Sequence, residues 1–596
     1  MPRLAQDARV TLVDSLEDVL DLRAWLGERR DWLGCDIETT GLTLGRDEIR
    51  LFQLGDLRRG WALPWDDWRG AVKAFLPSYR GRIVFHNSAF DLAFLDMDGV
   101  HVPQVQVDDT MVMAHLINPA GRIGLKPLAA KLVGPEALLG KDDLTDAFKA
   151  GGWDFGTIPV DHPAYYVYSA MDTMLTAALA EELWPTIEEK YREIYDIEMG
   201  CIQVLVPARI KGMAVDLDYV ARTRAQYVSD LEHLRVQIPC EPSKDRQIRD
   251  LFDARGREMG RGPLGTWWPF RTEKGEVSVD DDALKAFHDD FPDIMPPLRE
   301  WRKKSRLVSA YLNNILTMNV DSVLRCNIRT LAARTGRMSI TEPALQTLPR
   351  GRAIRDAFVA RDGHKIVQAD YKQAELRVFA WYAQCRPMIE AFQRDEDLHS
   401  WVAAQVYANG DMSGFTKLQR QISKNVQFAR IYGAGPAKIA ATAGVEVEAI
   451  EDFMRQYNNL FPEAQEFMQG LMGQMHKRLR EGEAYVTTRL GRRLVVDRDK
   501  LYSGLNYLIQ STATSDVIKL KLCELDAAGL GEYIRLPIHD EILFEAPDED
   551  VDDLLETIRR VMPERQLFGD CPLEIDTDVL SRWGDHYPDP APRPQA

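Results

Sequence analysis

The sequence contains few cysteines and no long apolar run. Its seven cysteines are scattered and include no C-x-x-C pair, which excludes a disulfide framework and a thiolate zinc site. No run of about 18 apolar residues is present to span a bilayer, and the N-terminal segment is too polar for a secretory signal. We therefore expect reduced cysteines and a protein that acts in the cytoplasm without a membrane.

The chain is long, and its charge is unevenly distributed. Its 596 residues predict several domains rather than one hydrophobic core. The net charge of −18 disfavours nucleic acid as a partner, but residues 350–438 contain 14 basic against 9 acidic residues. Residues 329–355 also interleave six arginines with a single acid. This segment fits either a phosphate-binding track or an ordinary solvated surface.

Two parts of the chain differ in their pattern. Residues 1–190 alternate short apolar strands with helical stretches, which predicts a compact α/β domain. Residues 191–596 combine long helical stretches with a few strand-like segments, which predicts an α+β part. No internal repeat is visible, so the position of the domain boundary rests on the order of the motifs.

Four acidic residues of the first part have spacings that bring them onto shared faces. Asp36 and Glu38 are two apart in a predicted strand, so both side chains point to the same side of it. Asp91 follows Asn87 by one helix turn, and Asp172 ends a similar Y-x-x-x-D motif. Grouped carboxylates need cations, and hard oxygen ligands favour Mg²⁺ or Mn²⁺. A pair of such ions can support the cleavage of a phosphodiester.

The order of the motifs D-x-E-T, N-x-x-x-D and Y-x-x-x-D resembles that of the proofreading 3′-5′ exonuclease domains of the DnaQ-like group. The resemblance implies an RNase H-like sheet and an attacking water that is oriented by Tyr168 and Glu38. It also implies that four carboxylates bind the metals: Asp36, Glu38, Asp91 and Asp172. Outside this set, we expect His86 and residues 108–118 to serve core packing and a turn.

A second group of residues lies on one predicted helix in the other part of the chain. Residues 417–432 contain no glycine or proline, and Gly433 follows as a stop signal. Steps of four put two cations and then two aromatic rings on one face, over about 18 Å at about 1.5 Å per residue. These residues are Arg420, Lys424, Phe428 and Tyr432. A nucleoside triphosphate needs cations beside its phosphates and flat rings beside its base, so this helix is a candidate nucleotide-binding element.

Two aspartates lie at the ends of predicted strands. Asp370 ends the strand-like run K-I-V-Q-A-D, and Asp540 lies where two strand-like runs meet, directly after His539. If these strands are neighbours, the two carboxylates converge and can hold two Mg²⁺ ions at a primer 3′-hydroxyl and a triphosphate. An aspartate at a turn is usually structural, so this interpretation depends on the surrounding motifs.

The motifs D-Y-K-Q-A-E-L-R, R-x-x-x-K-x-x-x-F-x-x-x-Y-G and H-D-E resemble those of family A DNA polymerases, over residues 190–585. The resemblance implies template-directed DNA synthesis from dNTPs, with proofreading by the first part. It implies a multidomain α/β and α+β fold, with an RNase H-like exonuclease domain at residues 1–190 and a right-hand polymerase domain at residues 191–596. The polymerase domain would divide into a thumb at 200–320, a palm at 321–380 and 495–596, and fingers at 381–494.

The same resemblance implies residue roles at the polymerase site. Two Mg²⁺ ions, or Mn²⁺ in their place, would be held by Asp370, Asp540 and the Tyr371 carbonyl, with Glu541 close by. Lys424 would act as a general acid toward pyrophosphate, and Glu375 would be the steric gate that excludes ribonucleotides. The residues implied to contact the nucleotide are Arg420, Lys424, Phe428, Tyr432, Glu375 and Gln373, with Phe428 stacked on the nucleotide and Tyr432 at the templating position of open fingers. Those implied to contact primer-template DNA are Arg337, Gln346, Asn506, Gln510 and His539.

The sequence also departs from the family pattern. Ala344 replaces a frequent asparagine and Tyr502 a frequent arginine, so some minor-groove and template contacts are expected to be missing. The exonuclease motifs begin near Met1, so we expect no 5′ nuclease domain, as in the replicative polymerase of a bacteriophage acting in its host's cytoplasm. We expect a monomer, and any processivity partner is unidentified.

Other functions would share some of these features. A single-subunit RNA polymerase or a reverse transcriptase shares the palm chemistry, but Glu375 and the exonuclease motifs argue against both. A catalytically dead DNA-binding protein would be expected to have lost a metal-binding acid, and none is lost. A stand-alone exonuclease with an unrelated second half would have no nucleotide-binding helix.

Overall fold

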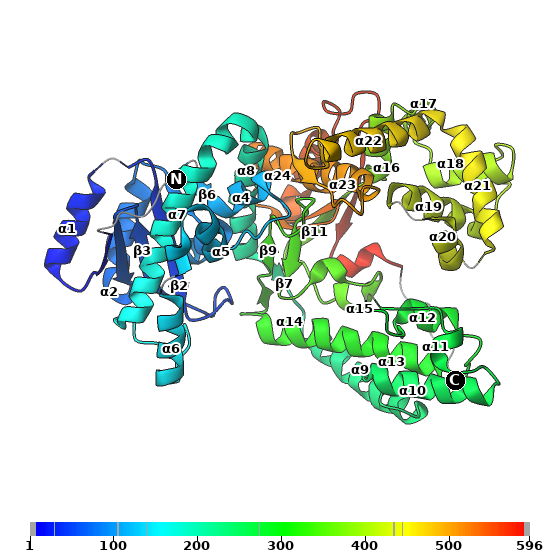
Figure 1. Cartoon of the computed structure of the whole chain (residues 1–596), viewed down its shortest axis with the longest axis horizontal. Coiled ribbons are helices and arrows are strands. Elements are labelled where there is room, and N and C mark those ends of the chain that lie inside the picture. The colour runs from blue at the N-terminus through cyan, green and yellow to red at the C-terminus, as the bar shows by residue number, and fades with distance from the viewer. Residues whose placement is uncertain are drawn as a thin grey trace. The chain divides into compact units, whose positions relative to one another are not determined.

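The computed structural model describes residues 8–28, 30–103, 106–138, 140–272, 274–432, 435–443 and 445–588 (Figure 1). The chain forms two compact units. Unit 1 comprises residues 1–212, 328–340 and 363–579, and unit 2 comprises residues 213–327, 341–362 and 580–596. Gly433, the expected helix stop, lies outside the described residues. All seven cysteines are described, and no disulfide bond joins any of them, as predicted.

Unit 1 begins with a mixed six-stranded sheet of order β1-β4-β3-β2-β5-β6. Strand β3 is antiparallel to both β2 and β4, whereas β1 is parallel to β4, and β5 is parallel to β2 and β6. The strands are β1 (Arg9–Leu12), β2 (Leu33–Thr39), β3 (Ile49–Gly55), β4 (Arg59–Pro64), β5 (Ile83–Phe85) and β6 (Val107–Asp109).

Helices pack on both faces of this sheet. The long helix α7 (Pro163–Lys190) runs along β2, β3 and β4. Helix α7 ends at Lys190, and a separate helix, α8 (Arg192–Lys211), follows it. The other helices of this part are α1 (Leu16–Leu26), α2 (Trp65–Phe75), η1 (Leu76–Ser78), α3 (Ser88–Met97), α4 (Thr110–Ile117), α5 (Leu125–Leu132), η3 (Pro135–Leu138) and α6 (Lys141–Gly151).

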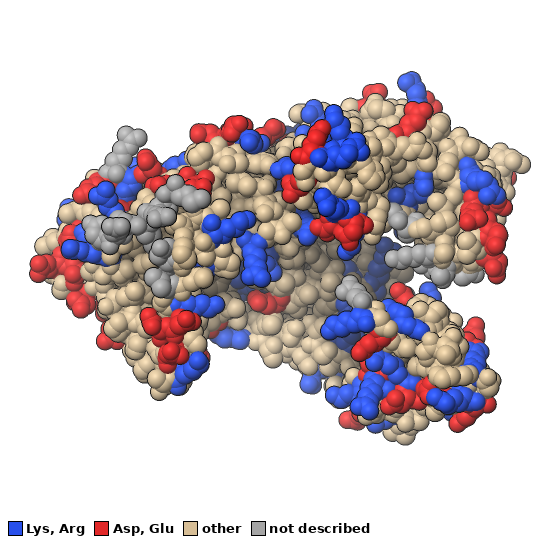
Figure 2. Space-filling model, in the orientation of Figure 1, with Lys and Arg blue, Asp and Glu red and all other residues tan. Residues whose placement is uncertain are grey.

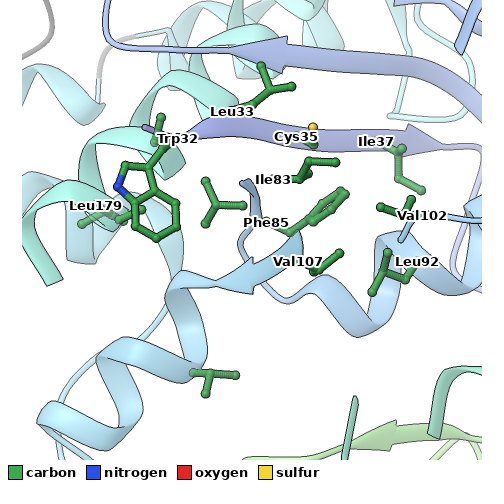
Figure 3. Packing of buried hydrophobic residues seen from close by; sticks show 14 of the residues in the cluster. Trp32, Leu33, Cys35, Ile37, Ile83, Phe85, Leu92, Val102, Val107 and Leu179 are labelled. Atoms are coloured by element: carbon green, nitrogen blue, oxygen red, sulfur yellow. The ribbon is translucent and has the colours of Figure 1, made fainter. Parts of the chain in front are cut away.

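The core of this part forms where β2 and β5 carry apolar side chains in alternation. Cys35 and Ile37 of β2 lie close to Phe85 of β5, together with Leu92 of α3 (Figure 3). Because successive strand residues point to opposite faces, burial of Cys35 and Ile37 turns Asp36 and Glu38 to the other side of β2. The packing of the core therefore decides which way the two acids point.

The second part of unit 1 contains a four-stranded sheet of order β14-β15-β11-β16. Strands β14 (Ile534–Ile538) and β15 (Glu541–Pro547) form an antiparallel hairpin, and β15 also pairs antiparallel with β11 (His364–Tyr371). Strand β16 (Ile575–Leu580) lies beside β11. Helix α8 packs on β14, and α25 (Val551–Val561) packs on β11 and β15.

A group of helices lies between β11 and β14 in the sequence. Helix α19 (Lys417–Tyr432) has the bounds that the sequence predicted, and it packs against α18 (Leu398–Tyr407), α20 (Pro436–Ala443) and α23 (Ser503–Ser511). The remaining elements are α16 (Ala374–Ala383), α17 (Arg386–Gln393), α21 (Val447–Leu460), α22 (Pro462–Arg480), the π-helix η6 (Thr512–Asp516), α24 (Val517–Ala527), η7 (Asp548–Asp550) and the hairpin of β12 (Tyr485–Thr487) and β13 (Arg493–Val495).

Unit 2 is mainly helical and has a hydrophobic core of its own. Helices α9 (Leu217–Gln237) and α13 (Met295–Leu307) pack together, and an aromatic cluster around Phe252 and Trp268 holds the segment between them. The other elements are β7 (Met213–Ala214), α10 (Asp245–Glu258), α11 (Leu264–Trp267), α12 (Asp281–Ala286), η4 (Val308–Leu312), α14 (Asn313–Met318), β8 (Val323–Leu324), η5 (Leu345–Thr347), α15 (Arg352–Arg355) and η8 (Trp583–His586). Strands β9 (Asn327–Arg329) and β10 (Ser339–Thr341) form a two-stranded ribbon, and most of their residues belong to unit 1.

Charged side chains of both signs are interspersed over the visible surface of each unit (Figure 2). The net charge of −18 is therefore not gathered into a single acidic face in this view. Within the described ranges, no helix is both long and apolar enough to cross a membrane.

Candidate active sites

The first site is built from one strand and two helices of the six-stranded sheet region. Strand β2 contributes Asp36 and Glu38, α3 contributes Asp91, and α7 contributes Asp172. Asp91 lies close enough to Asp36 for its charge to raise the pKa of the Asp36 carboxyl group. Asp91 also accepts a hydrogen bond of 3.1 Å from the backbone N–H of Ile37. The structure thus brings the four predicted acids together.

A glycine allows the fourth acid to come close. A Cβ atom at Gly34 of β2 would lie 2.0 Å from the carbonyl oxygen of Thr173 on α7. Only the absence of a side chain lets helix and strand approach so closely. Since Asp172 directly precedes Thr173, this contact fixes the distance of its carboxylate from Asp36 and Glu38.

Mutual repulsion and burial dominate the electrostatics of this site. Burial, followed by the charges of Asp91 and Glu38, raises the pKa of Asp36 well above its ordinary range. Burial and the charge of Asp172 raise the pKa of Glu38 to about 8. Burial raises the pKa of Asp172 to about 6, although the ammonium of Lys126 acts in the opposite direction.

Four carboxylates, two of them buried and two half-buried, fit hard divalent cations in donor chemistry, because such cations would remove this repulsion. In the described part of the chain, no three His, Cys, Asp or Glu side chains already stand in the arrangement of a metal site. Asp172 is in contact with Lys126, and Glu38 accepts a hydrogen bond of 2.9 Å from the hydroxyl of Ser169.

Tyr168 lies on α7 one turn before Asp172, as predicted from the spacing. The Nζ atom of Lys126 is 4.2 Å from the centroid of its ring. Burial, followed by the charges of Asp172 and Glu38, raises the pKa of the Tyr168 hydroxyl above its ordinary value. Tyr168 is therefore a neutral hydroxyl at neutral pH, able both to donate and to accept a hydrogen bond.

The sequence did not place Asn87 correctly. It was expected on the same helix face as Asp91, but it is the N-cap residue of α3 and has a left-handed φ of 77°. Its backbone N–H donates to Asp109 over 3.1 Å. His86 lies 2.9 Å from the hydroxyl of Thr110, which agrees with its expected role in packing and a turn.

The second site lies on the four-stranded sheet. The sequence predicted that Asp370 and Asp540 converge if their strands are neighbours. Strands β11 and β15 are neighbours, and their register puts Asp370 opposite Glu541. Asp540 lies in the turn between β14 and β15, and its carbonyl accepts a hydrogen bond of 3.3 Å from the Tyr371 N–H. His539 in the same turn has a left-handed φ of 57°. Strand β11 runs one residue beyond the predicted end, to Tyr371.

The carboxylates of this second site also repel each other. Burial, followed by the charges of Asp540 and Glu541, raises the pKa of Asp370 to about 8. Burial raises the pKa of Asp540 as well. The Oδ1 atom of Asp370 is buried and has no hydrogen-bond donor among the described residues. An orphaned carboxylate oxygen beside further acids fits a divalent cation.

Glu541 and Asp576 occupy different settings near these acids. Glu541 accepts a hydrogen bond of 2.8 Å from the side-chain amide of Gln368. Asp576, which the sequence did not single out, contributes to the raised pKa of Asp370 and pairs with Lys372 at 3.3 Å.

Helix α19 carries the predicted face of two cations and two rings. The opposite face of the helix is buried through residues such as Ile422 and Val426. On the predicted face, Arg420, Lys424 and Phe428 are half-buried and Tyr432 is exposed. Arg420 donates to Asp397 over 3.0 Å and lies 2.9 Å from the hydroxyl oxygen of Ser400. Asp397 is the N-cap residue of α18, and neither it nor Ser400 was singled out from the sequence.

The aromatic end of α19 contacts two neighbours. The centroid of the Phe428 ring is 5.6 Å from that of His399 and 5.9 Å from Lys424 Nζ. Tyr432 donates a hydrogen bond of 2.9 Å to Glu375 on α16.

Glu375 lies between two donors. Arg337 donates to its Oε1 atom over 2.8 Å, and Tyr432 donates to its Oε2 atom. Arg337 is itself held by a bond of 2.6 Å to the hydroxyl oxygen of Thr514. Hydrogen bonds thus connect Arg337, a predicted DNA contact, through Glu375, the predicted steric gate, to Tyr432, which is predicted at the templating position.

The remaining predicted residues are placed as follows. Asn506 lies on α23, and its Oδ1 atom is buried without a donor among the described residues. Gln373 is the N-cap residue of α16 with a left-handed φ of 50°, and its Oε1 atom is also without a donor in the described chain. Gln346 lies in η5 of unit 2.

Comparison with known proteins identifies the families that the two parts of the chain match. Residues 237–585 match the family described as DNA polymerase family A, and residues 13–188 match the family described as 3'-5' exonuclease. The chain is 29% identical over 615 residues to a DNA polymerase of Mycobacterium phage D29 and 29% identical over 611 residues to one of Mycobacterium phage L5. In both cases 97% of each chain is covered.

A solved structure has the same fold. It is described as the POL domain of Pol1 from M. smegmatis in complex with DNA primer-template and dNTP, and its TM-score to this chain is 0.78 at 23% identity. The match covers 97% of this chain and 99% of that one. The predicted order of an exonuclease domain and a polymerase domain of mixed α/β content is confirmed. The chain belongs to DNA polymerase family A and carries a 3′-5′ exonuclease domain ahead of its polymerase domain.

Proposed function

We propose that this DNA polymerase extends a primer 3′-hydroxyl with dNTPs on a DNA template at Asp370 and Asp540, and removes mispaired ends at the site around Asp36. The observation that carries the proposal is the pairing of β11 with β15, which brings Asp370 and Asp540 together beside an unsatisfied carboxylate oxygen. A separate carboxylate cluster on β2, α3 and α7 supports a second activity in the same chain.

Each site is proposed to hold two Mg²⁺ ions, for which Mn²⁺ could substitute. At the polymerase site the ligands would be Asp370, Asp540 and the carbonyl of Tyr371, with Glu541 nearby. At the exonuclease site they would be Asp36, Glu38, Asp91 and Asp172. Bound divalent cations lower the pKa of the attacking hydroxyl or water and neutralise phosphate charge.

The incoming dNTP is proposed to lie along α19. Arg420, held by Asp397 and Ser400, presents its remaining N–H groups to the triphosphate. Lys424 is proposed to donate a proton to the leaving pyrophosphate. Phe428 would stack on the nucleotide, and Gln373 at the start of α16 would contact it as well.

Sugar selection and template reading are proposed to share the hydrogen bonds of Glu375. Its carboxylate is fixed by Arg337 and Tyr432, so it cannot easily move away from a 2′-hydroxyl. Tyr432 would occupy the templating position in open fingers. The other DNA contacts are proposed to be Arg337, Gln346, Asn506, Gln510 and His539.

In the exonuclease site, Tyr168 and Glu38 are proposed to orient the attacking water. Glu38 is oriented by the hydroxyl of Ser169 and can accept a proton, because its pKa is raised to about 8. The Tyr168 hydroxyl, one turn from Asp172, would hold the water or the scissile phosphate by a hydrogen bond.

The division of the chain and its setting are also proposals. We assign the exonuclease domain to residues 1–190, the thumb to about 200–320, the palm to about 321–380 and 495–596, and the fingers to about 381–494. The phage relatives support a role as a replicative polymerase in the cytoplasm of a bacterial host. The protein is proposed to act as a monomer.

Primer extension with a labelled primer-template, with and without dNTPs, tests both activities. Asp370→Ala is expected to slow extension by several orders of magnitude with little loss of DNA affinity, because it removes a ligand needed in the transition state. Asp36→Ala with Glu38→Ala is expected to abolish degradation of single strands while extension persists. Extension by Asp370→Ala within about tenfold of wild type, or loss of both activities in the folded double variant, would contradict the two-site proposal.

A further inference from the structure

Lys126 occupies an unusual position for a lysine. Its side chain is only 11% exposed, and its Nζ atom contacts the carboxylate of Asp172, which is 12% exposed. Lysine is almost never so buried unless its charge is paired. Among the described residues, the ammonium has Asp172 as its ion-pair partner and no hydrogen-bond acceptor. The group that compensates the cost of burying this cation therefore belongs to the exonuclease site.

The position of Lys126 on its helix supports the same conclusion. Lys126 is the second residue of α5, where the partial positive charge of the helix N-terminus disfavours a cation. Helix α5 packs on α7, which carries Asp172. The acids of α7 and β2, together with the ring of Tyr168 on α7, compensate this unfavourable placement on α5.

Arg50, another cation near this site, does not contact the acids as Lys126 does. Lys126 counters the charges of both Asp172 and Glu38. Arg50 also acts on Glu38, but its guanidinium donates to the carbonyls of Phe155 and Ile158 over 2.5 Å each. Lys126 is thus the cation whose ammonium touches a proposed metal ligand directly.

We infer that Lys126 is a positioning residue of the exonuclease site, whose ammonium holds Asp172 against the other carboxylates and competes with divalent cations for that carboxylate. The inference rests on the proposed roles of the four acids. Its consequence is a higher cation requirement, because the cation must displace the ammonium from Asp172. Half-maximal exonuclease activity would then need a higher divalent cation concentration than it would without Lys126.

Thermal stability with and without a cation provides a test that needs no excision. In an Asp370→Ala background, Lys126→Met is expected to lower the metal-free Tm by several degrees, because the carboxylates lose their compensating charge. Saturating Mn²⁺ is expected to restore most of that loss, since a ligand that binds only the folded state stabilises it more when it binds more tightly. Lys131→Met, an exposed lysine of the same helix, is the matched control and should change neither Tm.

Cation titration of single-strand degradation provides the second readout, with Asp370 intact or replaced. The Mn²⁺ concentration for half-maximal degradation is expected to fall by about tenfold in Lys126→Met, as a neighbouring positive charge is removed. Lys126→Arg, which keeps the charge, should stay near wild type. Lys126→Gln replaces the Met variant if that variant does not fold.

Two results would overturn the inference. An equal Tm loss with and without Mn²⁺ would make Lys126 a packing residue only. An unchanged half-maximal Mn²⁺ concentration would show that the ammonium does not compete with the cation. Degradation that survives Asp36→Ala with Glu38→Ala would instead refute the proposed exonuclease site, whereas the Tm measurement for Lys126 would remain interpretable.

Discussion

At the scale of single residues, Phe428 lies on the proposed nucleotide face beside His399 and Lys424. A phenyl ring can stack on a base but cannot form a hydrogen bond through its edge as a tyrosine hydroxyl does. A dideoxynucleotide lacks the 3′-hydroxyl and loses whatever hydrogen bonds that group makes. With phenylalanine at position 428, the enzyme has no hydroxyl there to compensate for the loss.

Wild-type enzyme is therefore expected to resist dideoxynucleotide terminators. Phe428→Tyr is expected to raise the ddNTP-to-dNTP insertion ratio by about ten- to a hundredfold, the value of one to two good hydrogen bonds, with little change for dNTPs. Single-nucleotide insertion kinetics in an Asp36→Ala, Glu38→Ala background measure the ratio without excision. Equal ratios for parent and variant would mean that Phe428 is not at the sugar.

Glu375 offers a second residue-scale prediction. Its carboxylate accepts from Arg337 and Tyr432, so Glu375→Ala should both open space for a 2′-hydroxyl and leave two donors without their acceptor. We expect discrimination against ribonucleotides to fall by about a hundredfold, and insertion of dNTPs to become slower. Single-nucleotide kinetics with matched rNTP and dNTP pairs give both values, and unchanged discrimination would remove Glu375 from the gate.

The residues that sequence reasoning found and missed differ in one physical respect. Asp36, Glu38 and the face of α19 were predictable because strand alternation and helical spacing are local rules. Lys126 meets Asp172 across 46 positions of sequence, and Ser169 meets Glu38 across 131. A spacing rule cannot predict such pairs, because they depend on how α5 and β2 pack against α7.

At the scale of elements, the exonuclease site depends on the close approach of α7 to β2 at Gly34. In Gly34→Ala, the added methyl group would meet the Thr173 carbonyl, so α7 must move away from the strand. We expect loss of single-strand degradation by about a hundredfold, since catalytic groups must be placed within a fraction of an ångström, and retained primer extension.

Gly70→Ala is the matched control, because a Cβ at this position of α2 meets nothing within 4 Å. Degradation and extension assays on both variants, with circular dichroism to check folding, measure the effect. Degradation by Gly34→Ala at the wild-type rate would show that the position of Asp172 does not depend on this contact.

Elements themselves were predicted with uneven success. The bounds of α19 were correct, because a run without glycine or proline between clear stops is a local property. The pairing of β11 with β15 could only be stated as a condition, since residues far apart in sequence form it. Short strands such as β1 and β4 were not predicted, and Asn87 was assigned to a helix that begins one residue later.

At the scale of the whole molecule, a buried network of four charges connects distant segments of unit 1. Glu198 of α8 binds Arg492 and, at 2.7 Å, Lys519 of α24, and Arg492 donates to Asp516 over 2.7 Å. Each of these side chains is at most 1% exposed. Lys519 also donates to the Gly336 carbonyl over 2.7 Å. The network therefore fixes the backbone next to Arg337, at the polymerase site.

Removing one charge from this network should destabilise the unit strongly. Glu198→Gln leaves two buried cations facing a single carboxylate, and breaking a buried pair in this way costs about 3–5 kcal/mol in the free energy of unfolding. The control is Glu193→Gln, an exposed position on the same helix, where a surface change should stay within about 0.5 kcal/mol. Urea denaturation followed by tryptophan fluorescence compares the two variants. Similar small losses in both would mean that the four charges merely tolerate burial, whereas a large loss confined to Glu198→Gln would show that they hold the helix after the exonuclease domain to the loop that carries Arg337.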